Sequence, residues 1–97
     1  MLYSNKIPYR YEEVIQLGNK TIVPDFIIKH PATGELFYWE HFGMMDNPDY
    51  AKNACDKIRL YSLNGIIPSK QLILTYETKD DPLNPNEVKK IIEDYFL

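Results

Sequence analysis

The sequence predicts an α/β fold of the α+β kind, a single domain over residues 1–97 in which helices pack on a mixed four-stranded sheet. Two observations carry this prediction. Three β-rich segments follow one another with only turn signals between them, which is typical of an antiparallel meander. Two Asn-Pro helix starts then flank one further β-rich segment. The expected order of elements is therefore β-β-β-α-β-α.

The first half of the chain contains the three strands of the meander. The segment Tyr9–Leu17 (YRYEEVIQL) is predicted to form one strand, and a Gly-Asn turn signal follows it. The segment Thr21–Lys29 (TIVPDFIIK) is rich in β-branched residues and is predicted to form the second strand. A turn over His30–Glu35 (HPATGE) then leads to the third strand, Glu35–Phe42.

The second half contains two helices separated by the strand Gln71–Tyr76. Asn47-Pro48 begins a helix that is expected to end near Ser62, because asparagine caps a helix and proline suits its first position. Asn84-Pro85 begins the second helix in the same way. The expected apolar faces, spaced as helical neighbours, consist of Ala51, Ala54, Cys55, Ile58 and Tyr61 in the first helix and of Val88, Ile91, Ile92 and Tyr95 in the second.

The bulk composition excludes several classes of protein. A net charge of −3 gives no overall basic surface, which counts against a high-affinity nucleic-acid binder but not against an enzyme that meets DNA through a local basic patch and a metal. The single cysteine excludes an internal disulfide and a zinc site of the paired-cysteine kind, and it fits a cytoplasmic location. No apolar run approaches the length that spans a membrane.

Glu40 stands out because it interrupts an apolar, aromatic strand, and a buried charge needs a partner or a metal. If residues 31–34 form a tight turn, Asp25 lies opposite Glu40 on the neighbouring strand, with Cβ atoms about 5 Å apart. A divalent cation between the two carboxylates would remove their repulsion, and Mg²⁺ prefers such ligands. The alternative, that the acids are solvated or paired in salt bridges, is about equally favoured.

The chain resembles the PD-(D/E)XK nuclease superfamily, which has the restriction-endonuclease-like fold. Pro24-Asp25 on one strand, Glu40 on the next and a helix after it carry the resemblance, and it extends through the pattern PDF…WEHFG…NGI found in bacterial members. The core of that fold is α-β-β-β-α-β. The resemblance therefore implies that the first helix of this core is largely missing here, with only Met1–Ser4 as its remnant.

The resemblance implies an endonuclease that hydrolyses phosphodiester bonds of DNA with Mg²⁺ or Mn²⁺. Asp25 and Glu40 would bind the metal together with the backbone carbonyl of His41. The usual lysine position, two residues after the acid, is Phe42, and some members supply this lysine from the following helix instead. Lys57 is the preferred candidate for this third catalytic residue, and Lys52 is its rival. The side chain of His41 is expected on the opposite face from Glu40.

Other functions remain open from the sequence. The displaced lysine, the negative charge and the missing helix favour a catalytically inactive interaction or DNA-tethering module, and a fragment of a longer nuclease or a homodimer is compatible with either function. Cys55 is expected to pack in the core and His30 to be solvated. Glu12, Glu13 and Glu77 have no assigned role.

Overall fold

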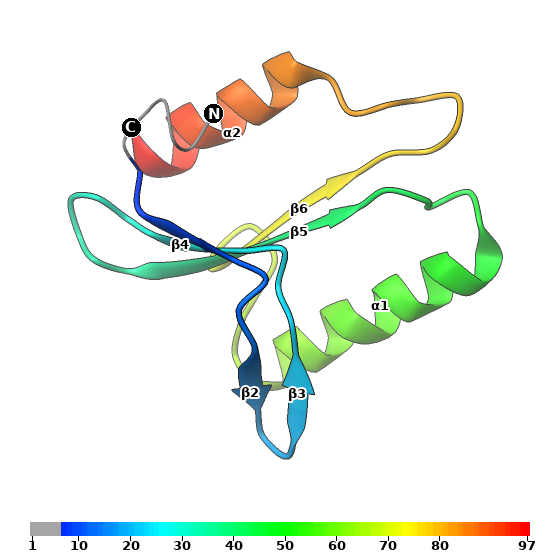
Figure 1. Ribbon diagram of the computed structural model, residues 1–97, viewed down its shortest axis with the longest axis horizontal. Helices are drawn as coiled ribbons and strands as arrows, with labels where there is room; N and C mark the ends of the chain where they lie inside the picture. Colours follow the sequence, from blue (N-terminus) through cyan, green and yellow to red (C-terminus); the bar gives the residue numbers. More distant parts are fainter. Residues whose placement is uncertain (1–6) are drawn as a thin grey trace.

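The computed structural model describes residues 7–97 as an α+β fold with a mixed four-stranded sheet and a helix on each of its faces (Figure 1). The sheet has the order β1-β4-β5-β6, and β2 and β3 form a separate two-stranded sheet. The elements are β1 (Tyr9–Tyr11), β2 (Ile15–Leu17), β3 (Lys20–Ile22), β4 (Phe26–Lys29), β5 (Leu36–Phe42), α1 (Pro48–Leu63), β6 (Leu72–Tyr76) and α2 (Pro85–Phe96). The expectation for Met1–Ser4 lies outside the described residues.

The first two of the three strands predicted for the first half of the chain are wrong, because each predicted strand forms two separate strands. The segment Tyr9–Leu17 forms β1 and β2, which belong to different sheets, and Glu12 between them has a φ of 52°. The segment Thr21–Lys29 forms β3 and β4, with Pro24 in the break. Proline cannot donate to a sheet ladder, so the chain changes sheet there. The pair β2–β3 is thus a hairpin inserted between β1 and β4.

The predicted turn between β4 and β5 is confirmed, and it sets the register of the sheet. The His30 N–H donates to the Glu35 carbonyl over 2.8 Å, and the Gly34 N–H donates to the His30 carbonyl over 2.9 Å. Gly34 has a φ of 75°, a conformation that glycine adopts without strain. Phe26 consequently lies opposite Trp39, which extends the register toward Asp25 and Glu40.

His30 is not simply solvated, as the sequence analysis expected, but holds this turn together. Its Nδ1 accepts hydrogen bonds from the N–H groups of Ala32 and Thr33 over 3.0 and 3.2 Å. Its ring lies against Phe96, with centroids 6.0 Å apart. The imidazole therefore does what an asparagine or aspartate side chain does in an Asx turn.

Both helices begin at their predicted caps. The Asn47 side chain accepts from the N–H groups of Asp49 and Tyr50, and the Asn84 side chain accepts from Asn86. Beyond the end of α1, Gly65 has a φ of 81° and lets the chain turn toward β6. Neither α1 nor α2 is long and apolar enough to cross a membrane, and these are the helices found in residues 7–97.

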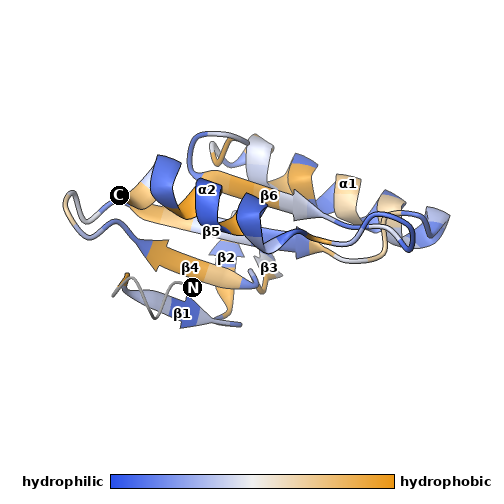
Figure 2. Cartoon of the chain, turned by 90° about the horizontal axis from the view of Figure 1, so that it is seen from above, coloured by the Kyte–Doolittle hydropathy of each residue, from blue (hydrophilic) through white to orange (hydrophobic). Residues whose placement is uncertain are grey.

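Hydrophobic cores lie on both faces of the sheet, and Figure 2 shows hydrophobic colour along β4 and β6. On the α2 face, the core is built from Ile7, Ile28, Phe37, Trp39, Ile73, Ile92 and Phe96. On the α1 face, Leu17 of the hairpin packs with Tyr61 and Leu72. Cys55 is exposed, so its predicted place in the core is wrong. The other prediction for this face holds for Ala54 and Tyr61, which are the buried residues of α1.

The role of His30 gives a prediction about stability. We expect His30→Ala to lower the free energy of unfolding by about 0.5–2 kcal/mol, as the loss of a helix cap does, because two N–H groups lose their acceptor. His30→Asn should recover part of this loss, since its amide oxygen can accept the same bonds. Urea unfolding at neutral pH measures both variants. Both lose the ring contacts, so equal losses would show that the hydrogen bonds contribute nothing.

Candidate functional site

The buried carboxylate of Glu40 is the centre of the candidate site. Glu40 is 1% exposed, and its Oε2 lies 2.7 Å from Nζ of Lys57 and accepts a hydrogen bond from the Tyr61 hydroxyl over 2.7 Å. Lys57 and Tyr61 are four residues apart on α1, so both side chains lie on the same side of the helix. The charge in the apolar strand is thus compensated by a cation and a hydroxyl from the helix that covers it.

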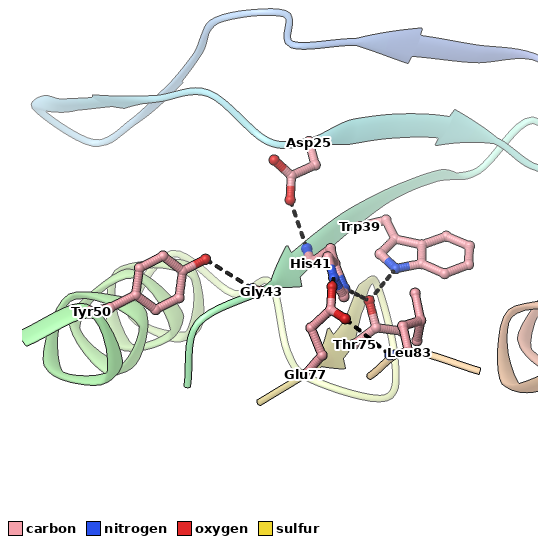
Figure 3. A network of polar contacts seen from close by, with 8 residues as sticks. All are labelled: Asp25, Trp39, His41, Gly43, Tyr50, Thr75, Glu77 and Leu83. Carbon is pink, nitrogen blue, oxygen red and sulfur yellow. Dashed lines mark hydrogen bonds and ion pairs between the residues drawn. The ribbon is translucent and has the colours of Figure 1, made fainter. Parts of the chain in front are cut away.

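Asp25 lies just before β4 and interlocks with the same part of β5. The Asp25 N–H donates to Oε1 of Glu40 over 3.3 Å, and Oδ2 of Asp25 accepts from the His41 N–H over 2.7 Å (Figure 3). The structure therefore brings Asp25, Glu40 and Lys57 together, as the sequence analysis predicted.

Pro24 explains why the backbone of His41 is available at this point. In the register of β4 and β5, the residues that exchange backbone hydrogen bonds alternate, and the next such pair after Phe26 and Trp39 would be Pro24 and His41. Proline has no N–H to give to the His41 carbonyl, and the His41 N–H bonds to the Asp25 carboxylate instead. The hydrogen-bond ladder between β4 and β5 ends here, and the backbone N–H and carbonyl of His41 face the candidate site.

The structure distinguishes the two lysine candidates by position. Besides contacting Glu40, the Lys57 ammonium donates to the Val23 carbonyl over 3.2 Å. Lys52 is exposed and forms no ion pair with residues 7–97. Phe42, at the usual lysine position of the superfamily, is buried and stacks with Tyr76 at a centroid distance of 5.9 Å. Lys57 is thus the lysine beside Glu40.

The ring of His41 lies on the other face of the sheet, as alternation predicted, and joins a polar network there (Figure 3). Its Nδ1 is 2.8 Å from Oγ1 of Thr75, and its Nε2 is 2.7 Å from Oε1 of Glu77. The Trp39 indole N–H donates to the same threonine oxygen over 3.2 Å, and the Leu83 N–H donates to Glu77. In the neutral ring, Thr75 donates to Nδ1 and Nε2–H donates to Glu77. The network fixes β5 at His41 without placing the ring beside Glu40.

Two pKa shifts report the electrostatics of these contacts. The hydrogen bond from His41, with a second from the Leu83 N–H, holds the pKa of Glu77 below its ordinary value. Burial, followed by the hydrogen bond to Glu40, raises the pKa of Tyr61 well above its ordinary value. The Tyr61 hydroxyl therefore keeps its proton and remains a donor to Glu40 across the neutral range.

Tyr61 and Thr75 are polar partners in these contacts that the sequence did not predict. Tyr61 was placed on the apolar side of its helix, which is correct, but its position one turn after Lys57 also indicates a shared target. The backbone of Glu12 lies beside the site, because its N–H donates to the Asp25 carbonyl over 3.2 Å. The side chain of Glu12 is exposed. Glu13 pairs with Arg10 instead.

The oxygen atoms at the site suit a cation that prefers oxygen ligands. Asp25 and Glu40 supply carboxylates, and the His41 carbonyl receives no hydrogen bond from Pro24, which has no N–H. Carboxylates and carbonyls are the ligand types that Mg²⁺ and Mn²⁺ accept. Hydrogen bonds from residues 7–97 reach only Oδ2 of Asp25 and leave Oδ1 as a further acceptor. Within the same residues, no group of three or more His, Cys, Asp or Glu side chains is arranged to hold a metal. A metal here would need the backbone carbonyl and water.

The hydroxyl of Tyr61 gives a prediction with a pH dependence. We expect Tyr61→Phe to lower the free energy of unfolding by about 1.5–3 kcal/mol at neutral pH, because Glu40 loses a buried hydrogen bond to its charged form. The folded-state pKa of Tyr61 is raised, so this stabilisation is complete below the unfolded pKa of about 10 and is lost as the pH rises above it.

The stability gap between the parent protein and Tyr61→Phe should therefore stay constant from about pH 7 to about pH 9 and narrow as the pH rises through about 10 to about 11. Urea unfolding at several pH values measures it. Tyr95→Phe removes a hydroxyl from α2 on the other face of the sheet and serves as the control. A gap that stays constant up to about pH 11 would contradict the proposed link between Tyr61 and Glu40.

Comparisons of the chain with protein-family models, with curated proteins and with solved structures found no match.

Proposed function

We propose that this chain is a metal-dependent nuclease domain of the PD-(D/E)XK type, which hydrolyses phosphodiester bonds in DNA. The observation that carries the proposal is the 2.7 Å contact between Lys57 and Glu40, with Asp25 interlocked beside them. Two acids and a lysine are the residue types that the resemblance implies. The lysine missing from the strand comes from α1, which follows that strand.

The architecture supports the same proposal. Three antiparallel strands, β1, β4 and β5, precede a helix, and β6 then returns parallel to β5. A second helix covers the opposite face (Figure 1). This arrangement agrees with the β-β-β-α-β part of the restriction-endonuclease-like core, with the hairpin β2–β3 as an insertion between its first two strands.

In this proposal, Asp25, Glu40 and the carbonyl of His41 would hold Mg²⁺ or Mn²⁺. When bound, such a cation polarises the phosphate and lowers the pKa of a bound water. Tyr61 fixes the Glu40 carboxylate, and the His41 N–H fixes that of Asp25. The Lys57 ammonium supplies a positive charge where negative charge develops on the phosphate.

A second candidate function is a non-catalytic interaction or DNA-tethering module with the same fold. One observation favours it: both oxygens of Glu40 already have donors within the chain, so the pair with Lys57 satisfies the buried acid without a metal. A fragment of a longer nuclease and a homodimer remain compatible with both functions. The two candidates differ in whether the site binds a divalent cation.

Metal binding gives the first test. We expect millimolar Mg²⁺ or Mn²⁺ to raise the melting temperature of the parent protein, because the cation binds the folded state and stabilises it by RT ln(1 + [cation]/Kd). Each kcal/mol of that stabilisation corresponds to a rise of roughly 4–8 °C. Asp25→Asn should lose this rise, yet it should melt no earlier than the parent in chelator, since an amide oxygen can still accept from His41. Asp94→Asn on α2 is the control. An equal rise in all three proteins would place the cation elsewhere, and no rise would favour the module.

Cleavage gives the second test. We expect Lys57→Gln to reduce the cleavage rate by about 10²-fold or more, because a positive charge beside the reacting phosphate is lost. Lys52→Gln should retain nearly full activity. Glutamine is preferred to an apolar residue at position 57 because it keeps a donor near Glu40, whose buried charge would otherwise be unpaired.

The substrates are duplex, branched and single-stranded DNA with Mg²⁺ or Mn²⁺, and melting curves check that each variant is folded. The opposite ranking of the two lysines would mean that Lys57 has only a structural role. If the folded parent cleaves none of these substrates, the nuclease proposal is wrong and the module is favoured.

A further inference from the structure

A hollow of about 430 Å³ lies between β3 and α1, beside the candidate site. Such a volume is in the range of ordinary ligand pockets, roughly 300–1,000 Å³. Three cations line it, namely Lys20 from β3 and Lys57 and Arg59 from α1, together with a single acid, Asp56. The hollow shares Lys57 with the cluster around Glu40, so the two features are adjacent.

The charge of this hollow differs from that of the molecule. The chain carries a net charge of −3, whereas the hollow is lined by two further cations, Lys20 and Arg59, besides Lys57, whose charge is paired with Glu40, and by one acid, Asp56. Within residues 7–97, neither Lys20 nor Arg59 forms an ion pair, and both are exposed. Their charges are therefore free to act on a ligand, and a local field of this sign attracts anions to a protein of opposite net charge.

Apolar side chains complete the lining of the hollow. They are Ile22, Leu60 and Leu63, and Leu63 is 78% exposed, the largest exposed fraction among the exposed large hydrophobic residues of the described chain. Cations beside an apolar surface suit a ligand that carries both phosphates and flat apolar groups. A nucleic-acid strand has this composition, because its phosphates alternate with sugars and bases.

We propose that this hollow binds the phosphodiester backbone of a nucleic-acid strand next to the phosphate at the Asp25–Glu40–Lys57 cluster. Lys20 and Arg59 contact neighbouring phosphates, and a sugar or base covers the exposed Leu63. This inference rests on the proposed function, since it extends that site along its substrate.

A second hollow among the described residues, beside β1 and the hairpin, is a weaker candidate for the same ligand. Two cations line it, Arg10 and Lys29, and Arg10 is already paired with Glu13 over 3.5 Å. No member of the Asp25–Glu40–Lys57 cluster lines that hollow. The observations therefore favour the hollow that contains Lys57.

The test measures binding separately from cleavage. Fluorescein-labelled single-stranded and duplex DNA oligonucleotides of one length are titrated with the parent protein in chelator at several salt concentrations. Each phosphate contact contributes about 0.7 to the slope of log K against log salt for single strands, and about 0.9 for duplex DNA. Lys20→Gln and Arg59→Gln should each lower that slope by about this amount and weaken binding several-fold at low salt.

Lys89→Gln on α2 is the matched control, since it removes the same charge from the opposite face of the sheet and should leave the slope unchanged. Both test residues are exposed, so melting curves should show no loss of fold. Slopes that do not change in Lys20→Gln and Arg59→Gln, or that change equally in Lys89→Gln, would overturn the proposal. A parent that binds neither oligonucleotide would also overturn it.

The outcomes separate this proposal from the proposed function. Lower slopes in the two variants of a parent that does not cleave DNA would support the binding site while contradicting the nuclease. Cleavage by a parent whose two variants bind with unchanged slopes would support the nuclease and overturn the binding site. Each slope, divided by about 0.7 for single strands or about 0.9 for duplex DNA, gives the number of phosphate contacts, and the larger number identifies the form of DNA that makes more contacts with the protein.

Discussion

The compensation of one buried charge, that of Glu40, is the constraint on which the rest of the structure depends. An ionised carboxylate at 1% exposure is costly unless donors surround it, and here the donors come from different parts of the chain. Lys57 and Tyr61 reach it from α1, and the Asp25 N–H reaches it from the residue just before β4. The interaction therefore joins a helix to two strands. The residues that stabilise this junction are also those that the proposed chemistry requires.

Pro24 also determines the arrangement of the candidate site, because it lacks the N–H that would continue the ladder between β4 and β5. Its missing N–H ends the ladder between β4 and β5, which leaves the His41 peptide facing Asp25 instead of a neighbouring strand. The ring of His41 is held on the opposite face by Thr75 and Glu77. One residue thus connects the two faces of the sheet, and its backbone is positioned by contacts that lie away from the candidate site.

Features set by local chemistry were predictable from the sequence, and features set by packing were not. The Asn-Pro starts at residues 47 and 84 fixed both helices, and the four-residue turn before β5 fixed the register that brings Asp25 to Glu40. The breaks in the first two strands contain residues of low β-propensity, Glu12 and Glu13 in the first and Pro24 and Asp25 in the second. They were missed because such residues also occur at strand edges and bulges, so they do not by themselves show that the chain changes sheet. Tyr61 was recognised as buried, but sequence spacing alone does not show what its hydroxyl contacts. Cys55 was misplaced because helical spacing gives the direction of an apolar face only to within about one residue.

The unequal burial of the two charges bears on whether their pair is only structural. Glu40 is 1% exposed, whereas the side chain of Lys57 is 28% exposed and lines the basic hollow. A pair that served stability alone gains nothing from this arrangement, because buried ion pairs contribute little net stability compared with apolar packing. The Lys57 side chain instead connects the buried acid with the surface of the hollow, where Lys20 and Arg59 lie. This placement of Lys57 beside Lys20 and Arg59 is the arrangement that the proposed phosphate-binding site would require, whereas an ion pair that only stabilises the fold would not require the neighbouring cations.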